Sequence, residues 1–162
     1  MLRGPKMKPN FRILLSAFSP APTVLRATLF KEIGWDDLVD NQAYWDTCAI
    51  RMSLALIKSG MTIPGRMEIK SGVHWGKFIE PGQSKLSSIL ARPGYLGRPE
   101  RFKKSEAEEG IGQRSGIVSF FDIDPPSDTQ HGHIDLVRPE NNFRRCSSAC
   151  YWGSSKVWFW PL

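Results

Sequence analysis

Residues 46–59, DTCAIRMSLALIKS, decide the fold of this chain. Asp46 or Thr47 can cap the start of a helix here, and Gly60 follows its end. Apolar residues fall on nearly every side of this helix, which is typical of a helix buried in a core rather than lying on its surface. The stretch therefore predicts a central buried helix with Cys48 in its first turn.

Two more helices are expected, one before and one after this central helix. Residues 23–33 form the first and end at Gly34, and residues 83–91 form the second. The region 64–111 is rich in glycine and proline. We expect mostly irregular surface structure there, with one mobile loop at 94–112.

The last third of the chain predicts strands. Residues 116–123 (GIVSFFDI) form an apolar strand, and residues 131–137 (HGHIDLV) alternate in polarity as a second strand. A turn is expected at 139–142, and residues 156–160 (KVWFW) form a last strand. Because helices come first and strands last, the predicted fold class is α+β with an antiparallel sheet.

Composition and charge limit the class of protein. With 41% apolar and 23% charged residues, we expect one globular domain over residues 1–162, with residues 1–10 flexible. The net charge of +6 implies some affinity for polyanions such as an anionic cell wall. No zinc-finger, RRM or basic-helix pattern occurs, so nucleic acid is not an expected partner. Since the apolar runs are short, neither membrane insertion nor a secretory signal is expected.

The three cysteines divide into a close pair and one odd residue. Cys146 and Cys150 form a C-x3-C pattern and can bridge if the segment turns, because disulfide-bonded Cα atoms lie about 4.4–6.8 Å apart. A bridge implies an oxidising destination, and the alternative is two unbridged thiols in a reduced cytosol. Cys48 is then a candidate reactive thiol.

Cys48 has the position of a catalytic nucleophile. Unpaired backbone N–H groups and the dipole at a helix start stabilise a thiolate. The N–H of Cys48 would also face the oxyanion of a tetrahedral intermediate. The alternative is a non-catalytic binding module in which Cys48 is a small core residue.

His133 is the histidine that best fits the base of such a nucleophile. His74 lies in the irregular region, whereas His131 and His133 stand at the start of a predicted strand with side chains on one face. Asp135 shares the face of His133, opposite the apolar residues of that strand. An ordinary surface position is the alternative for each histidine.

A zinc site is a further alternative for four of these side chains. Zinc accepts imidazole and thiolate donors, which are offered by His131, His133, Cys146 and Cys150. Their spacing matches no common zinc module, and the site is incompatible with a disulfide. We therefore expect neither a metal nor another cofactor.

Several segments, taken in order, resemble the fourth family of type VI secretion amidase effectors, toxins that degrade the cell walls of rival bacteria. The resemblance covers residues 23–162. Its motifs are WDTCAIRMSLAL (45–56), GIVSFFDI (116–123), GHIDLV (132–137), the C-x3-C pair and a C-terminal VWFWPL (157–162).

This resemblance implies a papain-like fold of the NlpC/P60 type, with the nucleophile at a helix start packed on an antiparallel sheet. It implies hydrolysis of the amide between γ-D-glutamate and meso-diaminopimelate in peptidoglycan stem peptides. Carried onto this sequence, Cys48 is the nucleophile and His133 is the general base and later acid. It also implies a cognate immunity protein and delivery by a type VI secretion system to the periplasm of a target bacterium.

The third member of the site is where this sequence departs from the family pattern. That pattern places an aspartate beyond the histidine motif, shortly before the cysteine pair, where this chain has Arg144. Asp135 and Asn142 are the remaining candidates, since an amide can also hold an imidazole tautomer. A Cys48–His133 dyad is the alternative.

Overall fold

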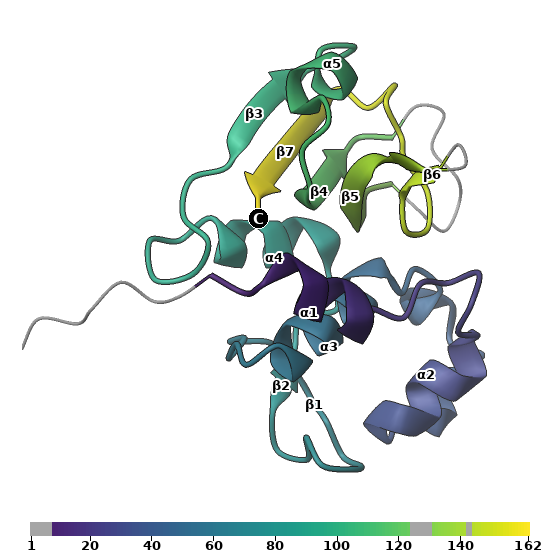
Figure 1. The fold of residues 1–162 in the computed structure, drawn as a ribbon. Helices are drawn as coiled ribbons and strands as arrows, with labels where there is room; N and C mark the ends of the chain where they lie inside the picture. Colours follow the sequence, from purple (N-terminus) through teal and green to yellow (C-terminus); the bar gives the residue numbers. More distant parts are fainter. Residues whose placement is uncertain (1–7, 124–130, 142–143) are drawn as a thin grey trace, which may run out of the picture.

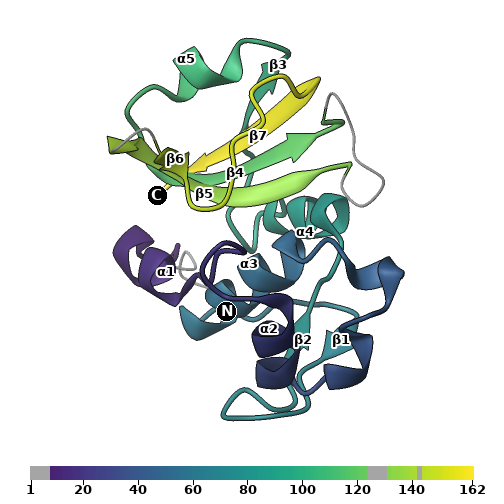
Figure 2. The same ribbon diagram turned by 90° about the vertical axis from the view of Figure 1, so that its right-hand side faces the viewer.

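A computed structural model describes residues 8–123, 131–141 and 144–162. The candidate site residue Asn142 lies outside the described residues. So does most of the N-terminus that we expect to be flexible, of which only residues 8–10 are described. Figures 1 and 2 show a layer of helices packed on one face of a sheet. Among the helices of the described ranges, none has the length and apolar character that crossing a bilayer requires.

Most of the helices lie in the N-terminal half of the chain. They are α1 (Phe11–Ala17), α2 (Arg26–Ile33), the short 3-10 helices η1 (Asp36–Leu38) and η2 (Gln42–Tyr44), α3 (Cys48–Lys58), α4 (Gln83–Leu90) and α5 (Ala107–Ile111). The side chain of Asn10 starts α1 by accepting hydrogen bonds from two backbone N–H groups of its first turn. Gly34 ends α2 in the left-handed conformation, with φ +80°.

All strand pairs are antiparallel. A small ribbon pairs β1 (Met67–Glu68) with β2 (Phe78–Ile79). The main sheet has five strands in the order β3-β7-β4-β5-β6. Their bounds are β3 (Glu100–Lys103), β4 (Gly116–Phe121), β5 (His133–Asn141), β6 (Arg144–Cys146) and β7 (Lys156–Pro161).

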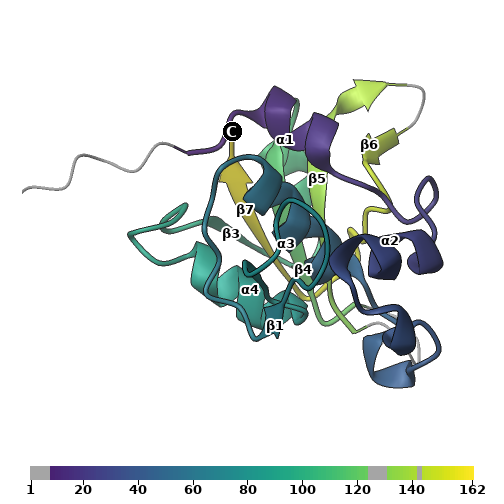
Figure 3. The same ribbon diagram turned by 90° about the horizontal axis from the view of Figure 1, so that it is seen from below.

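The core lies on both faces of the main sheet. On one face, Ile117, Ile134 and Leu136 pack with the buried residues of α3. On the other face, α5 covers a second cluster that includes Val118 and Phe120. Figure 3, seen from below, shows α3 in the middle of the helical layer beneath the sheet. This position explains why the first ten residues of α3 are all buried.

The predicted α+β class, the central helix and the helix that starts at Gln83 are confirmed. The mobile loop expected at 94–112 is wrong, because β3 pairs there with β7 and α5 covers the sheet. The turn expected at 139–142 is also wrong over its described part, because β5 continues to Asn141 through a bulge after Val137.

Candidate active site

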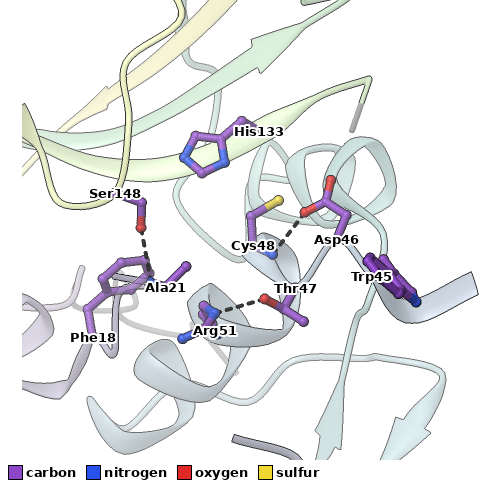
Figure 4. A pocket seen from close by; sticks show the side chains of 9 residues that line it. All are labelled: Phe18, Ala21, Trp45, Asp46, Thr47, Cys48, Arg51, His133 and Ser148. Atoms are coloured by element: carbon purple, nitrogen blue, oxygen red, sulfur yellow. Dashed lines mark hydrogen bonds between the residues drawn. The ribbon is translucent and has the colours of Figure 1, made fainter. Parts of the chain in front are cut away.

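A pocket of about 160 Å³ opens between the start of α3 and the start of β5. It brings together residues that are far apart in the sequence (Figure 4). Its lining consists of Phe18, Ala21, Trp45, Asp46, Thr47, Cys48, Arg51, His133 and Ser148. The two residues singled out most strongly by the sequence, Cys48 and His133, therefore share one pocket.

Cys48 is the first residue of α3, and only 7% of its surface is exposed. Its backbone N–H donates a hydrogen bond of 3.1 Å to Oδ1 of Asp46. Of the two predicted caps, Asp46 thus bonds through its side chain, whereas Thr47 makes no capping bond. In the free protein Asp46 therefore occupies this N–H, and the role of the N–H toward an oxyanion stays a prediction.

The surroundings of Cys48 disfavour its thiolate form in the free protein. Burial raises the pKa of Cys48 well above its ordinary value, and the neighbouring Asp46 raises it further. A backbone hydrogen bond from Ile134 acts in the opposite direction but is outweighed. The expected lowering of this pKa by the helix start is therefore wrong here, because desolvation and a nearby carboxylate dominate.

The imidazole of His133 is held by the aspartate two residues along β5. Nε2 of His133 lies 2.7 Å from Oδ2 of Asp135, and both side chains are almost fully enclosed. Since Nε2 is engaged, the nitrogen that faces Cys48 in Figure 4 is Nδ1. The ring also packs against Phe120 and Tyr151, which fixes its plane.

Asp135 is itself held by backbone donors. Oδ1 accepts the N–H of Leu136 at 2.7 Å, and Oδ2 accepts the N–H groups of Ser148 and Ala149, each at 3.0 Å. With three N–H donors around it, this side chain acts as the acceptor toward Nε2 of His133. The result is a fixed chain of hydrogen bonds from a loop, through Asp135, to His133.

The loop that supplies two of these donors is closed by a disulfide. Cys146 and Cys150 are bonded, with Cα atoms 5.4 Å apart, and Ser148 and Ala149 lie between them in sequence. The predicted bridge is confirmed. It overturns the zinc alternative, because two of the four donors required for that site are no longer thiols.

The structure separates the candidates clearly. Cys48, His133 and Asp135 gather at one place, whereas His131 is exposed and His74 lies elsewhere beside Lys77. Asn142 lies outside the described residues.

Two pocket residues were missed by sequence reasoning. Arg51 follows Cys48 by three positions and therefore shares its side of the helix, a spacing that could have identified it. Asp46 was considered only as a cap.

Comparison with known proteins gives one family and one fold. A family model described as type VI secretion system amidase effector protein 4, Tae4, matches residues 44–160. A search of curated proteins found no matching relative.

Solved structures of similar fold include a complex of Tae4 with Tai4 from Salmonella Typhimurium, with a TM-score of 0.74 at 20% identity. A second is the Tae4–Tai4 effector–immunity complex from Enterobacter cloacae, with a TM-score of 0.72 at 20% identity. Each match covers 96% of this chain and 99% of the other. At this identity, the likeness establishes a shared fold.

Proposed function

Because the chain belongs to the Tae4 family of type VI secretion amidase effectors, we propose that it is a cysteine amidase acting on peptidoglycan. The bond to be cut is the amide between γ-D-glutamate and meso-diaminopimelate in the stem peptide. One observation carries the proposal: Cys48 and His133 line the same pocket, and Asp135 holds His133 in a fixed orientation. Cys48 is the nucleophile, His133 the base, and Asp135 the residue that orients it.

The mechanism is acyl transfer in two steps. Nδ1 of His133 takes the proton of Cys48 as the sulfur attacks the γ-glutamyl carbonyl carbon. The protonated imidazole, stabilised by Asp135, then gives that proton to the departing diaminopimelate amine. Water, deprotonated by His133, hydrolyses the thioester and releases the glutamate carboxylate and the free thiol. Since burial and Asp46 raise the pKa of Cys48, the proposed mechanism has its proton move to His133 during attack.

The oxyanion needs a donor in this mechanism, and the N–H of Cys48 is the natural one. In the free protein Asp46 occupies this group. Substrate binding must therefore displace the carboxylate of Asp46 from the N–H, which also removes a negative charge from beside the reacting sulfur.

A papain-like fold of the NlpC/P60 type is part of the proposal. A nucleophile at the start of a buried helix, packed on an antiparallel sheet that carries the histidine, supports this class. We take residues 1–162 as the single domain that carries the activity.

A cognate immunity protein and a periplasmic site of action complete the proposal. Solved Tae4 proteins form complexes with Tai4 immunity proteins, which supports an equivalent partner for this chain. The Cys146–Cys150 disulfide supports delivery to an oxidising compartment such as the periplasm of a target bacterium.

Digestion of purified peptidoglycan tests this function. Mass spectrometry of the released muropeptides should show new ends at γ-D-glutamate and at diaminopimelate with the parent protein, and none with Cys48→Ala. Equal digestion by Cys48→Ala would exclude the mechanism. Binding to peptidoglycan without any cleavage would instead favour the non-catalytic module.

A further inference from the structure

Arg51 is a buried cation in the wall of the pocket. Only 2% of its surface is exposed. Nε donates to Oγ1 of Thr47 at 2.8 Å, and Nη1 donates to the carbonyls of Ser19 and Val24 at 2.9 and 2.6 Å. Within the described part of the chain, Nη2 of Arg51 has no hydrogen-bond partner. Nη2 is not one of the polar atoms that are both unbonded and fully enclosed, so it keeps some exposed surface. One N–H-bearing corner of the guanidinium is therefore left for a ligand.

The geometry of α3 holds the Arg51 side chain in the wall of the pocket that Cys48 also lines. Helical side chains lean toward the N-terminus, and the bond to Thr47 fixes Arg51 in that direction. In Figure 4 the Arg51 side chain lies between Phe18 and Thr47, on the pocket side of the helix. Cys48 precedes Arg51 by one helical turn, which is a rise of about 4.5 Å for three residues.

Charge at this position favours an anionic ligand. Because Arg51 is buried, its cation is poorly solvated, and this burial lowers its pKa. The nearby Arg26 lowers this pKa further, and among the described residues no carboxylate raises it. A cation that is short of both water and a carboxylate partner gains most from an anion that enters the pocket.

On the basis of the proposed function, we propose that Arg51 determines specificity by binding a carboxylate of the stem peptide beside the scissile amide. The γ-linkage leaves the α-carboxylate of D-glutamate free, three carbon atoms from the reacting carbonyl. With C–C bonds of about 1.5 Å, this spacer places the carboxylate about 5 Å from the reacting carbonyl carbon, in the pocket that both Cys48 and Arg51 line. The free carboxylate of diaminopimelate, on the other side of the bond, offers the same chemistry.

A purely structural role is the competing explanation, because Arg51 also ties down the segment that contains Phe18 and Ala21. Arg26 provides the matched control. Its two terminal nitrogens donate to the carbonyls of Val39, Tyr44 and Trp45, each at 2.7 Å, and it does not line the pocket. It has the tethering role of Arg51, through Trp45 among others, but does not itself line the pocket.

The test compares kcat/KM for three disaccharide–tetrapeptide muropeptides, in which D-alanine occupies one carboxylate of diaminopimelate and leaves one free. One is unmodified, one has the α-carboxylate of D-glutamate amidated, and one has the free carboxylate of diaminopimelate amidated. The parent protein should cleave one amidated form about 10- to 100-fold more slowly, as expected for the loss of a charge-assisted hydrogen bond. The form that is cleaved slowly identifies the carboxylate.

The variants separate recognition from stability. Arg51→Gln should cleave the free and amidated forms at similar rates, whereas Arg26→Gln should keep the parental preference while melting at a lower temperature. Equal rates for the three substrates with the parent protein would overturn the inference, even if a variant does not fold. An unchanged preference in Arg51→Gln would also overturn it. No cleavage of the unmodified muropeptide would instead overturn the proposed function.

Discussion

Replacing Asp135 by asparagine tests the hydrogen-bond chain that orients His133. The carboxyl group of Asp135 accepts four hydrogen bonds, from three backbone N–H groups and from Nε2 of His133. An asparagine has one oxygen and one NH2 group in the same space. Its best placement turns the oxygen toward His133, Ser148 and Ala149, and leaves the NH2 group against the N–H of Leu136.

The expected loss of stability follows from the N–H of Leu136, which the asparagine leaves without an acceptor. One buried donor left unsatisfied costs about 1–3 kcal/mol, so the free energy of unfolding of Asp135→Asn should fall by about that amount. Loss of the negative charge also removes the partner of the imidazolium that forms in the proposed mechanism. The matching change in a serine peptidase triad lowers kcat by about 10⁴-fold, and we expect a fall of about 10²- to 10⁴-fold here.

The assay combines urea unfolding with initial rates of muropeptide cleavage under conditions where the variant is folded. Asp122→Asn is the control: this carboxylate also accepts a hydrogen bond, from Ser155, but it is exposed and does not line the pocket. Because Asp122 is exposed and does not line the pocket, we expect the change to alter stability by less than about 0.5 kcal/mol and to leave kcat unchanged. A folded Asp135→Asn protein with the parental kcat would refute the orienting role.

Three further predictions concern the thiol, the disulfide and the core. Because burial and Asp46 raise the pKa of Cys48, its alkylation by iodoacetamide should be slow at neutral pH and accelerate above pH 9. Asp46→Asn should lower this pKa and speed the alkylation. An unchanged alkylation rate would contradict the effect of Asp46 on the thiol. Reduction of Cys146–Cys150, which closes a loop with a sequence separation of 4, should cost about 2 kcal/mol in urea unfolding and lower kcat. Identical unfolding curves with and without reductant would show that the bridge does not stabilise the fold. Leu56→Ala in the fully buried α3 should cost about 2–5 kcal/mol, measured by the same unfolding curves.

Local patterns in the sequence were sufficient to predict the helix and the strand that carry the candidate site. The all-round apolar character of α3 reports burial directly, and the alternation of β5 places His133 and Asp135 on one face. The C-x3-C spacing is short enough for its bridge to be inferred without the fold. These signals all act between residues close in sequence.

The features that escaped prediction depend on residues distant in sequence. β3 is a strand because it pairs with β7, more than fifty positions later. The orienting role of Asp135 was uncertain because two of its donors come from the loop at Ser148 and Ala149. The raised pKa of Cys48 results from the enclosure of the pocket, which no pattern around Cys48 reveals.

Because main-chain groups hold Asp135, the loop that supplies them can accept substitutions during evolution. Ser148 and Ala149 hold Asp135 with N–H groups that every residue except proline possesses. Their side chains are therefore free to vary between lineages while the imidazole of His133 stays in place. Asp135 has no such freedom, and the two cysteines preserve the loop conformation on which the donors depend. We expect substitutions in this loop to alter what touches the substrate long before they alter the chemistry.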